Sequence, residues 1–282
     1  MTSTPQSTYN VYDDEQPLST SLGYQLEKII NYLLRRSCAD GVHHSVRNTT
    51  EQVAKGDQDL AASKQKQFVT IGLSGGSLVQ ILANTLPYLQ LPWPQIRFFF
   101  VDERHVPFTS NESTYHAYDQ QLFRQLPLTQ DHVIKINADL TVEECAKDYE
   151  DKLRRLLQES STNEPSAVQS TNDETFDILL LGMGPDGHTA SLFPNHKVLD
   201  VDNCLVTYIK DSPKPPQERI TLTLTTINKA KHVLIVAMGE AKSQIVKEVI
   251  KDKNEQYPIG KIRPAIKTQV RWYLDKQAAS QL

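Results

Sequence analysis

Short apolar runs alternate with helical patterns along most of the chain. Four runs of five or six residues are mainly apolar or aromatic: 68–73, 96–101, 176–181 and 233–237. Apolar residues recur at helical spacing in the segments between and around them: 18–36, 79–86, 113–123, 142–158 and 241–251. Strands that are apolar throughout are typical of parallel sheets buried on both faces. The alternation therefore predicts an α/β protein, with a mostly parallel sheet and helices on both of its faces.

Polar segments indicate how the chain is divided. The first 16 residues are polar, so we expect a flexible N-terminal tail over 1–16 and a single domain over 17–282. Residues 40–67 are expected to form a partly exposed connection, and residues 159–174, rich in Ser, Thr and Asn, a surface loop.

Composition excludes several classes of partner. The formal net charge is −4, so the chain as a whole does not attract nucleic acid or an anionic membrane surface. The three cysteines are far apart, which suggests neither a zinc cage nor a disulfide framework. No stretch reaches the roughly 18 apolar residues that a membrane span needs. We expect a soluble, cytoplasmic protein without a structural metal, either a monomer or a small homo-oligomer.

Chemistry-bearing residues follow each of the four predicted strands. The clusters are Ser74-Gly75-Gly76-Ser77, Asp102-Glu103-Arg104-His105, Gly182 to His188, and Gly239-Glu-Ala-Lys242. In open parallel sheets, ligands bind beyond the carboxyl ends of the strands. The shared position of the clusters predicts one binding site built from all four.

The Ser74–Ser77 turn and three cations are candidates for binding an anion. The turn can direct several backbone N–H groups at a phosphate, although a plain strand-to-helix turn would have the same composition. It lacks the sequence of a P-loop. Lys242 lies in the first turn of a predicted helix, where a cation needs an anionic partner. Arg219 could bind a phosphate or simply lie at the surface. Arg104 could hold substrate and Asp102 could orient polar groups, or the two could form an internal ion pair that closes the strand.

The segment from Gly182 to His188 admits two interpretations. Its glycines satisfy G-x-G-x-x-G after a strand, the spacing of a dinucleotide-binding site. However, Pro194 follows too soon for the long helix that such a site requires. The alternative is a tight loop that presents Asp186 and His188 together, with His188 as a general base polarised by a carboxylate.

Several of these motifs resemble the 6-phosphogluconolactonase family in order and spacing. They are Leu73-Ser-Gly-Gly-Ser77, Val101-Asp-Glu-Arg-His-Val-Pro107, Glu112-Ser-Thr-Tyr115, the 14 residues from Leu181 to Pro194, and Arg219-Ile-Thr-Leu-Thr223. The resemblance implies a Rossmann-like α/β fold similar to that of glucosamine-6-phosphate deaminases, with no nucleotide, metal or other cofactor.

The resemblance also implies an activity and a role for each site residue. The reaction would be hydrolysis of 6-phospho-D-glucono-1,5-lactone to 6-phosphogluconate in the oxidative pentose phosphate pathway. By position, Ser74–Ser77, Arg219 and Lys242 would hold the phosphate of this small-molecule substrate. Arg104 would lie near the phosphate or the ring, and His188 would be the base. Whether Asp186 or Asp102 orients His188 stays open.

Two other functions fit the same motifs. The deaminase branch shares the Asp-Gly-His loop but has a glutamate five residues after the histidine, where this chain has Phe193. A sugar-phosphate sensor on the same fold would bind 6-phosphogluconate without turning over the lactone. The absence of the glutamate argues against the first, and the intact Asp186 and His188 pair against the second.

Overall fold

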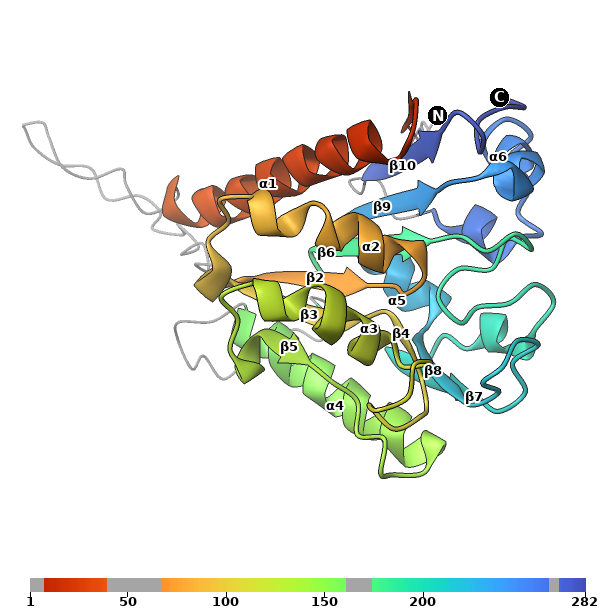
Figure 1. The fold of residues 1–282 in the computed structure, drawn as a ribbon. Helices are drawn as coiled ribbons and strands as arrows, with labels where there is room; N and C mark the ends of the chain where they lie inside the picture. Colours follow the sequence, from red (N-terminus) through yellow and green to blue (C-terminus); the bar gives the residue numbers. More distant parts are fainter. Residues whose placement is uncertain (1–7, 40–66, 161–173, 264–268) are drawn as a thin grey trace, which may run out of the picture.

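The computed structural model describes residues 8–39, 67–160, 174–263 and 269–282 (Figure 1). The predicted connection at 40–67 and the predicted surface loop at 159–174 lie almost wholly outside these ranges. Six α-helices are described: α1 (Glu15–Ala39), α2 (Ser77–Ala83), α3 (Thr114–Gln121), α4 (Val142–Ser160), α5 (Leu224–Lys229) and α6 (Ser243–Ile250). No helix in these ranges is long and apolar enough to cross a membrane.

The described strands form two sheets. The large sheet is parallel and has seven strands in the order β1 (Thr8–Tyr12), β10 (Gln269–Asp275), β9 (His232–Ala237), β6 (Ile178–Gly182), β2 (Val69–Leu73), β3 (Ile96–Phe100) and β5 (Val133–Ile134). The small sheet is antiparallel, in the order β4 (Asp102–Arg104), β8 (Arg219–Leu222) and β7 (Val206–Ile209).

The strand order places a topological switch point between β2 and β6. From β2 the chain continues outward to β3 and β5, whereas β6 returns to the other side of β2 and continues to β9 and β10. A crevice opens at such a point, at the carboxyl ends of the strands. The four strands predicted from sequence are β9, β6, β2 and β3, which are neighbours around this crevice.

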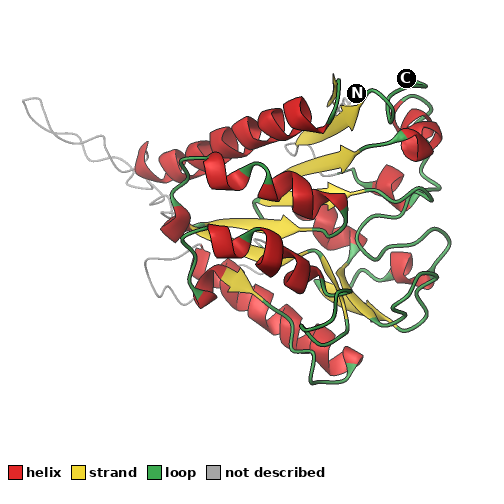
Figure 2. Ribbon diagram, in the orientation of Figure 1, coloured by secondary structure: helices red, strands yellow, loops and turns green. Residues whose placement is uncertain are grey.

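Helices cover both faces of the large sheet (Figures 1 and 2). Successive side chains of a strand point to opposite faces, so Ile178 and Leu180 pack in one hydrophobic cluster with residues of α1, α2 and α3. Leu179 and Leu181 pack in the other cluster, with residues of α4, α5 and α6. The predicted α/β class, with a mostly parallel sheet and helices on both faces, is confirmed.

The N-terminal segment differs from the prediction. Residues 8–12 were expected in a loose tail that ends at residue 16, but they form β1, and α1 begins at Glu15. Strand β1 pairs in parallel with β10, from the opposite end of the chain. Because this pairing joins segments more than 250 residues apart in sequence, the local pattern gave little sign of it. Residues 1–7 lie outside the described ranges.

Candidate active site

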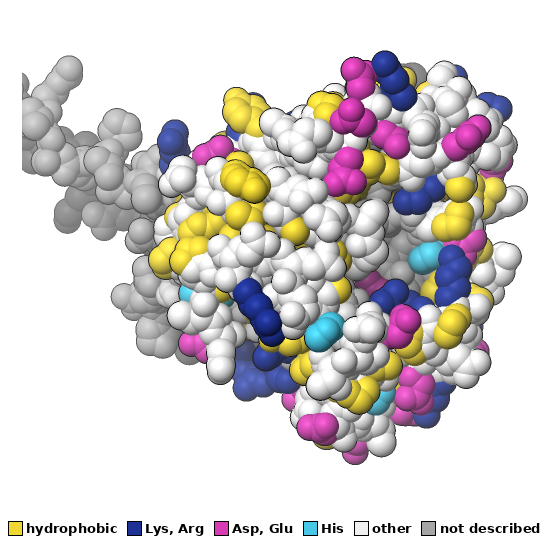
Figure 3. Space-filling model, in the orientation of Figure 1, with side chains coloured by type: hydrophobic (Ala, Val, Ile, Leu, Met, Phe, Trp, Pro, Cys, Tyr) yellow, Lys and Arg dark blue, Asp and Glu magenta, His cyan; other side chains and the backbone are white. Residues whose placement is uncertain are grey.

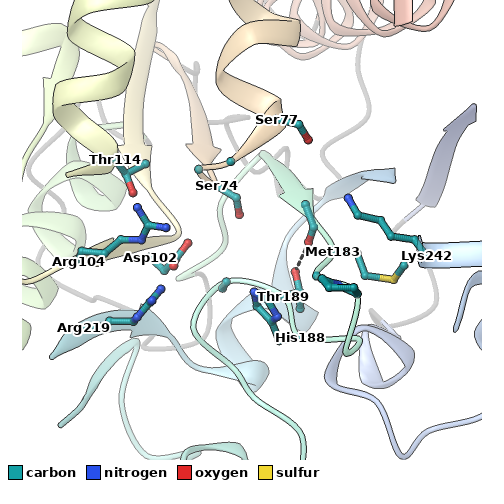
Figure 4. Close-up of a pocket in the computed structure, with 16 residues that line it drawn as sticks. Ser74, Ser77, Asp102, Arg104, Thr114, Met183, His188, Thr189, Arg219 and Lys242 are labelled. Atoms are coloured by element: carbon teal, nitrogen blue, oxygen red, sulfur yellow. Dashed lines mark hydrogen bonds between the residues drawn. The ribbon is translucent and has the colours of Figure 1, made fainter. Parts of the chain in front are cut away.

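A cavity of about 240 Å³ lies beyond the carboxyl ends of β2, β3, β6 and β9. In Figure 3 this side of the molecule is hollowed, with histidine and Lys or Arg side chains beside the hollow. Figure 4 shows Arg104 and Arg219 on one side of the cavity, Lys242 on the other, and Ser74 and His188 between them. The cavity thus carries more positive than negative side chains, which favours an anionic ligand.

The Ser74–Ser77 turn joins β2 to α2 at the switch point. The Ser74 N–H donates to the Leu180 carbonyl of β6 at 3.0 Å, and Gly76 adopts a φ of 72°, which favours glycine. Ser74 is 4% exposed, and within the described part of the chain its Oγ makes no hydrogen bond. A buried hydroxyl that lines a cavity without a partner is suited to bind a polar ligand.

Glu103, in β4, fixes the cavity wall beside this turn. Its carboxylate accepts the N–H groups of Thr114 and Tyr115, both at 2.7 Å, at the start of α3. Burial raises the pKa of Glu103, and these backbone donors oppose the rise. Arg104 donates to the Glu112 carbonyl at 2.7 Å through Nη1. Arg104 and Thr114 are thereby both held at the cavity.

Asp102 lines the cavity but binds a neighbour of the His188 loop. Its Oδ2 accepts the hydroxyl of Ser191 at 2.8 Å, and the backbone N–H of Ser191 donates to Thr221 of β8. Asp102 is 7% exposed and Ser191 is fully buried. The Asp102 carboxylate therefore ties the start of β4 to the segment that follows His188, and acts on the His188 ring only electrostatically.

Asp186 contacts His188 directly. The Asp186 carboxylate forms a hydrogen bond with His188 Nδ1, and Lys214 Nζ lies 3.1 Å from the same Asp186 oxygen and 3.2 Å from Nδ1. An ionised carboxylate can only accept, so the Lys214 ammonium and the His188 Nδ1–H both donate to Asp186. This arrangement leaves Nε2 of His188 as the ring nitrogen that can accept a proton.

The environment keeps the imidazole neutral and the carboxylate charged. Burial lowers the pKa of His188, the charge of Lys214 adds to this effect, and Asp186 opposes it. Burial by itself raises the pKa of Asp186, but the hydrogen bond and charge of His188, with Lys214, bring the net pKa below its usual value. A neutral imidazole hydrogen-bonded to a carboxylate is the state that a general base needs.

Two glycines allow the tight loop that carries Asp186 and His188. A Cβ on Gly184 would lie 2.1 Å from His188 Nδ1 and 2.6 Å from the nearest carboxylate oxygen of Asp186. Gly187 has a φ of 77°, and a Cβ there would lie 2.6 Å from the ring of Tyr257. The loop is closed by the Gly184 N–H, which donates to the His188 carbonyl at 2.9 Å.

Phe193 lies between the histidine and an arginine. Its ring centroid is 4.9 Å from that of His188, and Cζ of Arg219 lies 5.7 Å from the Phe193 centroid. Arg219 donates through Nε and Nη2 to the carbonyls of Lys214, Pro215 and Pro216. Arg219 therefore fixes the loop that carries Lys214 as well as lining the cavity. Burial lowers the pKa of Arg219, and the charge of Asp102 opposes this effect.

The chain is similar in sequence to a family of known proteins. Residues 43–272 match the family model "Glucosamine-6-phosphate isomerases/6-phosphogluconolactonase". The chain belongs to this family. A 6-phosphogluconolactonase from Bos taurus is 44% identical over 216 residues, covering 74% of this chain and 79% of the bovine protein. A human 6-phosphogluconolactonase is 43% identical over 215 residues, with the same coverage of both chains.

Solved structures of the family share the fold. A 6-phosphogluconolactonase from Trypanosoma cruzi superposes with a TM-score of 0.72 at 26% identity, covering 99% of this chain and 98% of that one. One from Thermotoga maritima has a TM-score of 0.72 at 23% identity and covers 96% of this chain and 100% of that one. The Rossmann-like architecture expected from the resemblance is thus confirmed.

The structure brings the residues selected from sequence to one place. Those that line the cavity are Ser74, Gly75, Gly76, Ser77, Asp102, Arg104, His188, Arg219 and Lys242. Asp186 does not line it and instead contacts His188. The sequence did not identify Thr114 or Lys214. Thr114 lies within a motif typical of the family. Lys214 lies in the proline-rich segment 212–216, and the local sequence gives no other indication of a role for it.

The described residues around the cavity include neither the helix of a dinucleotide-binding site nor a cluster of metal ligands. Between β6 and β7 the chain, which is described throughout, contains no α-helix, so the glycines 182, 184 and 187 lack the helix of a dinucleotide site. Within the described ranges, no group of three His, Cys, Asp or Glu side chains could hold a metal ion.

Proposed function

We propose that the chain hydrolyses 6-phospho-D-glucono-1,5-lactone to 6-phosphogluconate, with His188 as the base that activates water. The observation that carries the proposal is the pairing of His188 Nδ1 with Asp186, which leaves Nε2 as the acceptor in a ring that lines a cationic cavity. The family and its lactonase relatives support the same reaction. By this reaction the enzyme acts in the oxidative pentose phosphate pathway.

The phosphate of the substrate would bind through the Ser74–Ser77 turn, Arg219 and Lys242. Arg104 would lie near the phosphate or the sugar ring. Binding energy from the phosphate would then place the C1 carbonyl near His188, which raises the rate of attack by fixing its geometry.

Proton transfer through His188 accounts for both halves of the reaction. Nε2 removes a proton from water as the water oxygen bonds to C1, and the Asp186 carboxylate stabilises the imidazolium that forms. The bond between C1 and the ring oxygen then breaks, and the imidazolium returns the proton to the ring oxygen as it becomes the 5-hydroxyl. Cationic and backbone donors at the cavity would stabilise the tetrahedral oxyanion, each by roughly 3–4 kcal/mol.

Phe193 separates this reaction from that of a deaminase. Its ring packs against His188 at the position where the deaminase motif has a glutamate, so no acid stands there to assist opening of an amino sugar. Lactone hydrolysis requires an activated water and a stabilised oxyanion, both of which this site can supply. The deaminase and the sensor remain as outcomes of the test.

The test measures turnover of two substrates by one preparation. 6-Phosphogluconate formed from fresh lactone is measured through 6-phosphogluconate dehydrogenase, with the spontaneous rate subtracted, and glucosamine 6-phosphate is supplied separately. We expect lactone turnover and no deamination. The reverse result would establish a deaminase, and binding of 6-phosphogluconate without turnover would establish a sensor.

A variant pair tests the role of His188. His188→Ala should lower kcat on the order of 10²–10⁴-fold while 6-phosphogluconate still binds. The matched control is His196→Ala, because His196 pairs with Asp211 and does not line the cavity. Nearly full turnover in His188→Ala would disprove the assignment.

We also propose that the protein acts in the cytoplasm, as a single domain that includes β1 as well as the expected residues 17–282. Three cysteines without paired spacing fit a reducing compartment. One relative, from Arabidopsis thaliana, is a chloroplastic 6-phosphogluconolactonase, 39% identical over 241 residues. Fluorescence microscopy of the tagged full chain tests the compartment.

A further inference from the structure

Lys242 is held at the cavity by its backbone rather than by its side chain. It lies at the end of a 3₁₀ turn (Glu240–Lys242) that follows β9, and it reaches the cavity from the side opposite Arg104 and Arg219 (Figure 4). Among the described residues, its ammonium forms no hydrogen bond or ion pair. The direction of this side chain therefore depends on the turn that carries it.

Asp275, the last residue of β10, fixes the start of that turn. Both of its carboxylate oxygens lie 3.0 Å from the backbone N of Gly239, which donates to them. Gly239 has a φ of 90°, so the chain bends sharply here, and its carbonyl accepts the N–H of Lys242 at 3.2 Å. A continuous set of bonds thus runs from Asp275 through Gly239 to Lys242.

The carboxylate has a second effect, because it is buried. Asp275 is 7% exposed, and its Oδ1 also accepts the N–H of Ala278 at 2.7 Å. Backbone N–H groups that donate to a buried carboxylate form strong, charge-assisted bonds. Burial lowers the pKa of Lys242, and the negative charge of Asp275 opposes this effect. Asp275 therefore favours the charged ammonium as well as the shape of the turn.

We propose that Asp275 is a positioning residue for phosphate binding: its carboxylate fixes the Gly239 turn from which the Lys242 side chain reaches the cavity and the substrate phosphate. The inference rests on the proposed function, because it assumes that Lys242 binds the phosphate. It assigns a binding role to the carboxyl end of β10, a strand that contributes no residue to the cavity lining.

Two variants separate the geometry from the charge. Asp275→Asn keeps an oxygen acceptor for the Gly239 N–H but removes the charge, whereas Asp275→Ala removes both. We expect KM for the lactone to rise about 3-fold in Asp275→Asn and about 10-fold in Asp275→Ala, with kcat within about 2-fold of the parent, since the lost interaction is with bound phosphate. Lys276→Ala is the matched control, because its ammonium pairs with exposed Asp13.

A double-mutant cycle with Lys242 decides between positioning and simple structural support. If Asp275 acts through Lys242, Asp275→Ala should raise KM by less than about 2-fold when Lys242 is already Met. An undiminished 10-fold rise in that background would overturn the proposal. So would a fall in Tm with no change in KM, because Asp275 would then only brace the C-terminal turn at Ala278.

Calorimetric binding distinguishes failure of this inference from failure of the proposed function. The probes are 6-phosphogluconate and gluconate, which differ by the phosphate. Asp275→Ala should weaken binding of 6-phosphogluconate about 10-fold and leave gluconate binding unchanged. This result can be obtained even if the wild-type chain turns over no lactone. Equal weakening of both probes would contradict the proposal.

Discussion

The imidazole of His188 lies so close to Gly184 that no side chain fits between them: a Cβ on Gly184 would lie 2.0 Å from Cε1 of His188. The same Cβ would lie 2.6 Å from the carboxylate of Asp186. Gly184, one of the three glycines that match the dinucleotide-binding pattern, therefore has a different structural role. It lets the carboxylate and the imidazole pack directly on the backbone.

Gly184→Ala should displace the catalytic pair. The added methyl group would force His188 and Asp186 away from the loop, and a shift of about 1 Å in a catalytic group can cost on the order of 10²-fold in rate. We expect kcat to fall by that amount. Steady-state kinetics with a thermal melt measure the effect.

Gly23→Ala is the matched control for this steric change. A Cβ on Gly23, in α1, would lie 2.4 Å from a methyl carbon of Thr85, just after α2, and neither residue lines the cavity. It should lower Tm while kcat is retained. If both variants lost activity in proportion to their fall in Tm, the predicted displacement of His188 and Asp186 by Gly184→Ala would be refuted.

Asp186→Asn should lower kcat on the order of 10²–10⁴-fold, and Asp102→Asn should lower it less. Asp186 contacts Nδ1, so an amide there would disturb the tautomer and the orientation of the ring, whereas Asp102 binds the hydroxyl of Ser191. Parallel measurements of kcat for the two variants compare the carboxylates. The opposite ranking would assign the orienting role to Asp102.

Lys214→Met should shift the acid limb of the pH profile to higher pH. Loss of activity on acidification follows protonation of His188, whose pKa is lowered by burial and further by the charge of Lys214. Removing that charge raises the pKa, so the variant loses kcat/KM at a higher pH than the parent does. The measurement is kcat/KM from about pH 5 to pH 8, across the usual histidine range.

Lys210→Met is the control for Lys214, because Lys210 pairs with Glu143 and does not contact the histidine. Its profile should match that of the parent. A shift of the Lys214→Met profile to lower pH would contradict the electrostatic assignment.

The parts of the fold that could be predicted from sequence are those with a local signal. The runs that became β2, β3, β6 and β9 are mainly apolar, and each is followed by glycines or charged residues. Their meeting at one crevice follows from parallel strands, whose carboxyl ends lie at the same edge. Eight of the residues that line the cavity could therefore be selected from their place after these strands, whereas Arg219, at the start of β8, was selected as a possible phosphate contact and from its motif.

The elements that were missed depend on long-range pairing. Strand β1 forms only against β10, and the three-stranded sheet brings Asp102–Arg104 against Arg219–Leu222. Lys214 reaches Asp186 because Arg219 holds the proline-rich loop by its carbonyls. The choice between Asp186 and Asp102 as partner of His188 likewise depends on the distance from each carboxylate to the imidazole. That distance cannot be read from the spacing of the residues in the sequence.

Among the described residues, the buried Ser74 hydroxyl has no hydrogen-bond partner in the protein, so a ligand in the cavity can stabilise the fold by supplying one. A buried polar group without a hydrogen bond costs about 1–3 kcal/mol, and a ligand oxygen at the cavity would recover that energy. Ser74→Ala should therefore raise Tm without ligand, yet gain less from added 6-phosphogluconate than the wild type does. Ser19→Ala, which removes another unpaired buried hydroxyl, on α1, should raise both melting temperatures equally. Natural selection for turnover would then have kept a serine at position 74 that selection for stability alone would replace.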